Sequence, residues 1–237
     1  MKVEAERGDV NATMATARRA GALYFLFMIV AIVGEFFFPT FLVLGDATAT
    51  AHNITAAEGT YRLGILTGFV THVIFIFLVV ILYRLFKDVD QSQALLMVLL
   101  VSIGVALALA DLLLKFVPLV LLSGADSLSA LTKPQLDALA LGALRFHGDG
   151  AGVVTAFWGL WLFPFGILVI KSGFFPRVLG ILLLVAGFAY LMTSVTSIVL
   201  PRSLHVVSQI MMPLYFGEVP IIFWMLIRGA KAPEVRT

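Results

Sequence analysis

The stretch Tyr61-RLGILTGFVTHVIFIFLVVILYR-Leu85 decides which kind of fold this chain can adopt. Between Arg62 and Arg84 it contains no Asp, Glu, Lys or Arg. A transmembrane helix needs roughly 20 consecutive, mostly apolar residues to cross a hydrocarbon core about 30 Å thick. This run therefore predicts a membrane-spanning helix.

Five more runs of the same kind flank this stretch, namely Ala20–Leu44, Ala94–Leu122, Gly150–Ile170, Arg177–Leu200 and Leu204–Ile227. The whole chain agrees with them, because only 13% of its 237 residues are charged and its mean hydropathy is +1.05. Strands of membrane barrels are alternating segments of about ten residues, whereas these runs are continuous and longer. We predict an all-α polytopic membrane helix bundle with six transmembrane helices in one domain, residues 18–228, between polar cytoplasmic tails 1–17 and 229–237.

Basic residues are distributed unevenly between the two sides of the predicted bundle. Cytoplasmic loops carry an excess of Lys and Arg. Placing the N-terminus in the cytoplasm puts eleven basic residues there: Lys2, Arg7, Arg18, Arg19, Arg84, Lys87, Lys171, Arg177, Arg228, Lys231 and Arg236. Arg62, Lys133 and Arg202 fall on the outer side. Both termini are therefore predicted to be cytoplasmic.

Several function classes find no support in the composition. The chain has no cysteine, which excludes disulfides, thiolate metal sites and cysteine nucleophiles. Its basic residues flank the spans, so no basic face is free for nucleic acid. No phosphate-binding loop, dinucleotide fingerprint, serine elbow or haem-type histidine pair occurs, so no cofactor is expected. The lipid bilayer is the one partner that the sequence indicates, and it gives no oligomeric state.

Two outer connections contain helix-start signals. Asp46 can cap a short helix that is rich in Ala and Thr and runs to Glu58. The sequence Thr132-Lys-Pro-Gln135 fits a capping box with proline in the first turn. A helix from Lys133 to Ile170 would be roughly 55 Å long, well beyond the hydrocarbon core. We expect it to bend or protrude.

The stretch Ala143-LRFHGDGAGVVTA-Phe157 places three charged or ionisable residues beside three glycines. Each of Gly148, Gly150 and Gly152 weakens a helix by up to about 1 kcal/mol relative to alanine. We predict a junction here between an outer helix and the fourth span. In the alternative interpretation, Gly148-x-x-x-Gly152 forms a small-residue face for close helix packing.

The segment Lys171-SGFFPRVLGILLLVAGFA-Tyr190 resembles the bacterial integral-membrane family catalogued as domain of unknown function 4386. The stretches Arg18-RAGAL-Tyr24 and Gly45-DATATAHN-Ile54 are similar too, so the resemblance covers about residues 18–200. It implies a multi-pass protein of the bacterial cytoplasmic membrane with six spans. It implies no activity.

Ionisable side chains in a span are costly and are functional candidates by default. Asp111 and Lys115 are four residues apart, and so are Arg145 and Asp149, so each pair can neutralise itself on one helix face. Glu35 can similarly meet Arg62. These six are either boundary pairs or the walls of a vestibule. The full candidate pocket comprises Glu35, Arg62, His72, Asp111, Lys115, Arg145, His147, Asp149 and Glu218.

Metal binding is a weaker alternative for the histidines. His72, His147 and His205 could converge with Asp111 or Asp149 on zinc, but the chain has no H-x-x-x-H or HExxH spacing. The competing interpretation makes His72 a hydrogen-bonded core residue and places the others at the membrane boundary.

The sixth span sets Glu218 between Pro213 and Pro220 and beside Gly217. Proline removes a helical hydrogen bond, and broken helices persist in membranes where they face protein or a cavity. We expect Glu218 to face the bundle interior beside a break at Gly217–Pro220, within reach of His72. The alternative is a proline kink with a purely structural role.

The preferred function is a protein with an outward-opening polar intramembrane pocket that binds, senses or transports a small molecule, a lipid or a proton. The alternatives are an intramembrane metal-dependent hydrolase and a structural subunit of a membrane complex.

Overall fold

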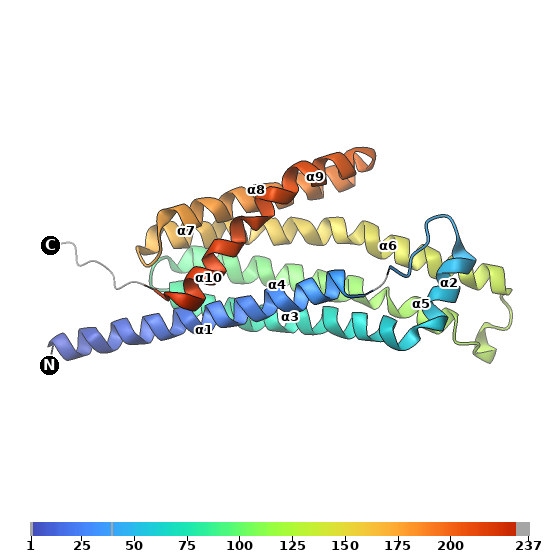
Figure 1. Cartoon of the computed structure of the whole chain (residues 1–237), viewed down its shortest axis with the longest axis horizontal. Helices are drawn as coiled ribbons and strands as arrows, with labels where there is room; N and C mark the ends of the chain where they lie inside the picture. Colours follow the sequence, from blue (N-terminus) through green and yellow to red (C-terminus); the bar gives the residue numbers. More distant parts are fainter. Residues whose placement is uncertain (1, 39, 231–237) are drawn as a thin grey trace. The chain divides into compact units, whose positions relative to one another are not determined.

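The computed structural model describes residues 2–38 and 40–230, without the side chains of residues 2–11, 35 and 36. Its described residues form helices and no strand. They are α1 (Lys2–Phe36), α2 (Ala47–Ala56), α3 (Glu58–Phe86), α4 (Gln91–Leu113), α5 (Phe116–Leu121), η1 (Asp126–Leu128), α6 (Lys133–Leu160), α7 (Leu162–Ser172), α8 (Arg177–Val199), η2 (Pro201–Ser203), α9 (Leu204–Tyr215), η3 (Phe216–Glu218) and α10 (Val219–Ile227) (Figure 1).

Six helical segments of this structure are long and apolar enough to cross a membrane. They are 12–34, 58–86, 91–121, 133–172, 177–199 and 201–227. The predicted fold class, an all-α bundle of six membrane-spanning helices, is confirmed. The predicted bounds agree best for the fifth span. The first predicted span reached Leu44, whereas α1 ends at Phe36.

The chain divides into two compact units. Unit 1 comprises residues 1–28, 74–105 and 152–237, and unit 2 comprises residues 29–73 and 106–151. Four long helices, α1, α3, α4 and α6, contribute residues to both units. Each unit has its own packing and its own polar centre.

In unit 1, α7 and α8 approach each other through glycines on both sides. A Cβ atom on Gly166 would lie 2.8 Å from the Gly180 carbonyl oxygen, and one on Gly180 would lie 2.6 Å from the Gly166 oxygen. Seven residues away, Gly159 at the end of α6 and Gly187 in α8 repeat this reciprocal contact at 2.7 and 2.9 Å. Small residues allow such close backbone contact between membrane helices.

The first and sixth spans meet at one end of unit 1. Arg18 Nη2 donates a hydrogen bond of 3.3 Å to the Ile227 carbonyl oxygen, which α10 leaves without a helical donor. A Cβ atom on Gly21 would clash with the backbone of Met225 and Leu226. These contacts place the start of the first span and the end of the sixth on the same side of the membrane.

Unit 2 has a small apolar core of Ile54, Tyr61, Ile65, Leu112 and Leu144. The predicted Asp46 cap in this unit is confirmed, and one of the two hydrogen bonds of the predicted capping box is present. The Asp46 carboxylate accepts a 2.8 Å hydrogen bond from the Ala49 N–H at the start of α2. At the start of α6, the Gln135 side chain accepts a 2.8 Å hydrogen bond from the Thr132 N–H.

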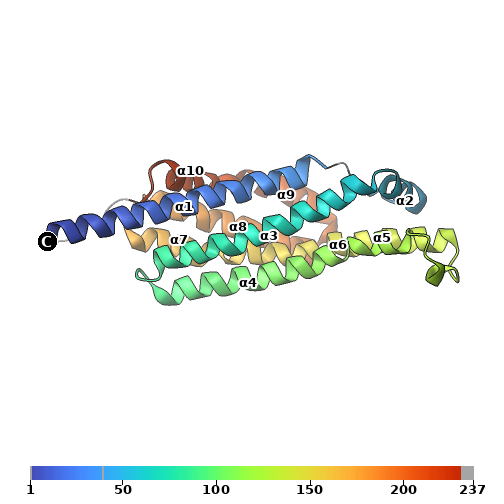
Figure 2. The same ribbon diagram turned by 90° about the horizontal axis from the view of Figure 1, so that it is seen from below.

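Helix α6 runs unbroken through Gly148, Gly150 and Gly152 (Figures 1 and 2). The predicted junction at these glycines is wrong. The helix is interrupted only at Trp161, before α7, where Pro164 supplies no N–H for the Leu160 carbonyl.

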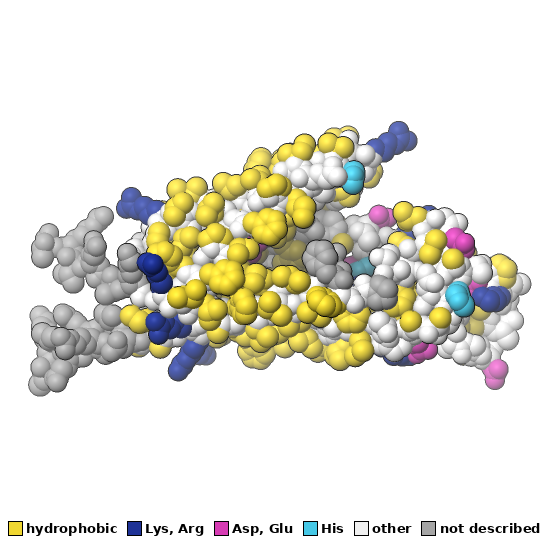
Figure 3. Space-filling model, in the orientation of Figure 1, with side chains coloured by type: hydrophobic (Ala, Val, Ile, Leu, Met, Phe, Trp, Pro, Cys, Tyr) yellow, Lys and Arg dark blue, Asp and Glu magenta, His cyan; other side chains and the backbone are white. Residues whose placement is uncertain are grey.

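Apolar side chains remain exposed along the spans of unit 1. Val206, Ile210 and Phe216 in the sixth span are 57%, 62% and 62% exposed. Figure 3 shows many hydrophobic side chains on the visible face of α9 and α10. Exposed apolar surface of this extent is suited to lipid rather than water.

Candidate functional site

The predicted pocket residues are distributed unequally between the two units. Glu218 belongs to unit 1, and the other eight fall in unit 2. The Glu35 side chain lies outside the described residues. The polar groups therefore form two separate centres, which we describe in turn.

The centre of unit 2 is a contact between Asp111 on α4 and His147 on α6. His147 Nδ1 lies 2.6 Å from Asp111 Oδ2, and the two side chains are 24% and 12% exposed. Lys115 is close enough to act electrostatically on both. At this distance the charge state of each group acts on the other.

This contact lies beside a break in the third span. Pro118 has no N–H, so the Leu114 carbonyl cannot form its usual helical bond. It accepts a 3.2 Å hydrogen bond from the Val117 N–H instead, and the Lys115 carbonyl accepts a 2.8 Å bond from the Tyr61 hydroxyl. Asp111 therefore stands on the last turn of α4, where the backbone leaves the regular helix.

Gly150 allows Asp111 to approach α6. A Cβ atom at this position would lie 2.6 Å from Asp111 Oδ1, whereas one on Gly148 would meet nothing within 4 Å. Gly152 has a different neighbour, Ser197 on α8. Gly150 and Gly152 therefore pack against neighbouring helices. Gly148 does not, so it has no part in the predicted small-residue face.

The predicted ion pairs of Arg62 and Arg145 have different outcomes. Arg62 Nε contacts Glu58 Oε1 at 2.7 Å, one turn earlier on α3. Its predicted partner Glu35 has a side chain outside the described residues, so that pair stays a prediction. Arg145 and Asp149 make no ion pair among the described side chains, and both are exposed. Their positions on α6, about 200° around the helix from His147, turn them away from the Asp111 contact.

His72 forms a local contact on α3. Its Nδ1 lies 2.6 Å from the Gly68 carbonyl oxygen one turn earlier, as expected of a hydrogen-bonded core histidine. His72 belongs to unit 2 and Glu218 to unit 1. Their predicted proximity stays a prediction.

The centre of unit 1 surrounds Glu218. Its Oε2 accepts a 2.5 Å hydrogen bond from the hydroxyl of Tyr24, a residue of α1 that is 1% exposed. The Tyr190 hydroxyl of α8 also acts on the carboxyl group. Glu218 therefore points at the helices of its own unit.

A predicted helix break brings Glu218 to these partners. The sixth span is interrupted by the 3-10 turn η3, at Phe216–Glu218 rather than at Gly217–Pro220. Pro220 offers no N–H, and the Phe216 carbonyl accepts from the Val219 N–H instead. Gly217 lets the turn lie against α8, because a Cβ atom there would be 2.5 Å from the Leu182 oxygen.

Sequence reasoning missed the hydroxyl groups around Glu218. The Tyr190 and Tyr215 rings stack with centroids 4.4 Å apart, and the Tyr215 hydroxyl is 2.5 Å from Thr193 Oγ1. These residues come from α8 and α9, so no spacing along one helix could bring them together. The one available signal was Tyr190 and Thr193, three residues apart in a span.

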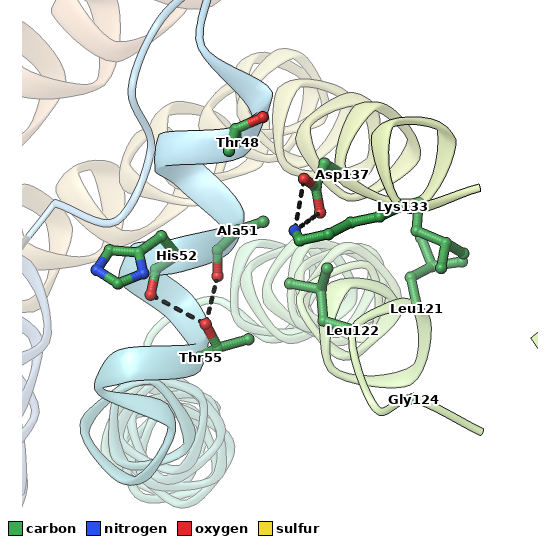
Figure 4. A pocket seen from close by; sticks show the side chains of 10 residues that line it. Thr48, Ala51, His52, Thr55, Leu121, Leu122, Gly124, Lys133 and Asp137 are labelled. Atoms are coloured by element: carbon green, nitrogen blue, oxygen red, sulfur yellow. Dashed lines mark hydrogen bonds and ion pairs between the residues drawn. The ribbon is translucent and has the colours of Figure 1, made fainter. Parts of the chain in front are cut away.

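A cavity in unit 2 was also missed. It has a volume of about 460 Å³ and lies between α2, the end of α5 and the start of α6 (Figure 4). Its lining residues are Thr48, Ala51, His52, Thr55, Leu121, Leu122, Gly124, Lys133, Leu136 and Asp137. The signal that could have indicated it is the i, i+4 pair of Lys133 and Asp137 just after the capping box.

The metal hypothesis finds no ligand set in the described part of the chain. Among those residues, no three or more His, Asp or Glu side chains are grouped as metal ligands. His205, in unit 1, is exposed near the start of α9. Among the predicted metal candidates, His147 contacts one carboxylate, that of Asp111.

The fold and its two centres define a helical membrane protein of six spans with ionisable groups at helix breaks. The sequence pattern described as "Domain of unknown function (DUF4386)" matches residues 19–229, and the chain belongs to this family. The resemblance found in the sequence is thus confirmed, and the match extends beyond Leu200 through the sixth span.

A relative in Archaeoglobus fulgidus, described as "Uncharacterized protein", is 39% identical over 79 residues. The match covers 33% of this chain and 46% of the relative, so it spans less than half of that protein. No solved structure matches the chain.

Proposed function

We propose that this protein is a proton-responsive binding protein of the bacterial cell membrane, a transporter-like or sensor module with a polar pocket that opens outward. The observation that supports this most is the 2.6 Å contact of Asp111 and His147 beside a helix break. Imidazole is the side chain whose ordinary titration lies nearest to neutral pH. Uptake of one proton by His147 changes the charge at the break.

The proposal rests on a change in charge balance. With a neutral imidazole, the Lys115 ammonium is the opposite charge that acts on the Asp111 carboxylate among the described residues. With an imidazolium, the same carboxylate has two cations beside it, and the cluster gains an excess positive charge. A polar solute that prefers one of these two states is thereby linked to protons.

The depth of the cluster supports access from the outer side. Asp111 is twenty residues from Gln91, and His147 is twenty-four residues from Lys171, which corresponds to roughly 30 and 36 Å of helix. Gln91 and Lys171 lie at the predicted cytoplasmic boundary. The cluster then lies near the outer boundary of a core of about 30 Å.

The test is a histidine titration by NMR with the protein in lipid nanodiscs. We expect the His147 resonance to titrate within the pH range over which the protein stays folded. Asp111→Asn and Gly150→Ala should both displace that titration, the second because the new Cβ pushes away Asp111 Oδ1. Gly148→Ala is the matched control and should leave it unchanged. An invariant His147 resonance across this pH range would refute the proposal.

Proton entry into liposomes then separates the two forms of the proposal. A transporter should acidify the interior when the outside is acidified, and Asp111→Asn should abolish most of that flux. A sensor should titrate without flux.

A further inference from the structure

The cavity of unit 2 contains a carboxylate that is almost completely withdrawn from solvent. The Asp137 side chain is 2% exposed, and both of its oxygens accept hydrogen bonds from Lys133 Nζ, at 3.0 and 2.8 Å. A buried carboxylate needs a cation beside it. In this structure the cation is the end of a flexible side chain.

The side chain of the lysine that supplies this cation lies mostly in solvent. Lys133 is the first residue of α6, and its side chain is 74% exposed. Holding a long, exposed side chain in one conformation costs entropy, which offsets part of its attraction to the carboxylate. Another cation that binds Asp137 can therefore replace Lys133, whose ammonium group then returns to water.

The rest of the cavity is suited to an apolar group. Leu122 of the α5 end and Leu136 of α6 line it, and Thr48 and Ala51 of α2 face it from the other side. Figure 4 shows the Lys133 ammonium and the Asp137 carboxylate pointing toward α2, while the His52 ring points away from them. The volume of about 460 Å³ falls within the range of small-molecule pockets.

We propose that this cavity binds a small organic amine, whose ammonium group replaces Lys133 Nζ on Asp137 and whose apolar body lies against Leu122 and Leu136. Lys133 then acts as an internal competitor that satisfies Asp137 while the cavity is empty of ligand. An anion is disfavoured, because it would meet the buried carboxylate when it approached Lys133.

Amine binding does not depend on the proposed proton response. Asp137 lies ten residues before His147 on α6, roughly 15 Å along the helix. The Asp111→Asn variant should therefore retain amine binding. If His147 does not titrate but the amine binds, only the proposed function fails; the reverse result rejects the amine site alone.

The experiment compares three probes of similar shape by titration calorimetry in nanodiscs, with empty nanodiscs as the blank. The probes are 2-phenylethylamine, the neutral 2-phenylethanol and the anionic 3-phenylpropionate. We expect the amine alone to bind wild-type protein saturably. Asp137→Asn should abolish this binding, and Lys133→Met should strengthen it about fivefold, because it removes the competing ammonium.

The double variant Lys133→Met/Asp137→Asn removes both charges together and protects the test against misfolding of Lys133→Met. It leaves no uncompensated carboxylate and should not bind the amine. Weaker amine binding in a folded Lys133→Met, equal binding in Asp137→Asn or in the double variant, or selective binding of 3-phenylpropionate would each overturn the proposal.

Discussion

At Glu218, the ionisation of the carboxyl group can be tested separately from the hydrogen bond that Tyr24 donates to it. A glutamine carbonyl can accept the bond that Tyr24 donates to Oε2, but it cannot ionise. We expect Glu218→Gln to fold with wild-type stability at acidic pH. At alkaline pH it should be more stable than the wild type, because an ionised carboxylate within a span is costly.

Unfolding in mixed SDS micelles at several pH values measures this difference. Tyr24→Phe is the complementary variant, which keeps the carboxyl proton and loses the donor, and it should cost about 1 kcal/mol. Tyr83→Phe is the control, since that hydroxyl makes no hydrogen bond among the described residues. A Glu218→Gln protein that failed to fold at acidic pH would show that the carboxyl group itself is structural.

At the scale of elements, the contact of α7 with α8 depends on backbones that touch at two glycines. Gly166→Ala would bring a methyl group within 2.8 Å of the Gly180 carbonyl oxygen. Backbone cannot move aside as a side chain can, so we expect a loss of about 1–3 kcal/mol in unfolding free energy. Gly142→Ala in α6 meets nothing within 4 Å and should be neutral or stabilising.

Asp90, in the connection between α3 and α4, makes the stability of the fold depend on pH in a direction that can be predicted. Hydrogen bonds from Lys171 Nζ, at 2.7 Å, and from the Gln93 N–H lower the pKa of Asp90. A carboxyl group with a lowered folded-state pKa stabilises the fold above its unfolded pKa, and this stabilisation is lost as the pH falls through the folded value.

Asp90→Asn isolates the lysine contact, because asparagine caps a helix about as well as aspartate does. The variant should melt slightly below wild type at neutral pH and equally in strong acid. A difference that persisted or grew at acidic pH would contradict this assignment.

The sequence predicted those parts of the structure that depend on one segment at a time. The six apolar runs, the Asp46 cap and the broken sixth span all follow from residues close together in the chain. Pro164 is the local signal for the interruption at Trp161, whereas the three glycines at 148–152 favoured a junction that the structure does not have. The role of Gly150, which is to leave room for the Asp111 carboxylate of α4, depends on the packing of two helices.

The candidate site was harder to predict for the same reason. Asp111 and Lys115 have the spacing of a self-neutralising pair, yet the shortest contact of Asp111 crosses to His147. The partners of Glu218 come from α1 and α8. Ionisable side chains in a span can be recognised from sequence, whereas the helix that satisfies each one is set by tertiary packing.

At the scale of the whole molecule, both centres use the same backbone device. In each, a proline removes the i, i+4 donor, and the freed carbonyl accepts from the residue just before that proline. The ionisable residue stands within the same or the preceding turn. Broken helices of this kind recur in membrane proteins that bind ions or solutes within the bilayer.

The orientation of the molecule in the membrane remains a prediction, and it decides which side each centre faces. Six spans place the two termini on one side, and the Arg18 contact with Ile227 agrees. The eleven basic residues assigned to that side predict that it is the cytoplasm. We therefore expect a reporter that is active only after export to be silent when fused after Thr237 and active when fused after Asp126. A cytoplasmic reporter should give the opposite pattern at the same two positions. An exported signal after Thr237 together with silence after Asp126 would invert the topology, and the amine cavity and the Asp111 centre would then open toward the cytoplasm.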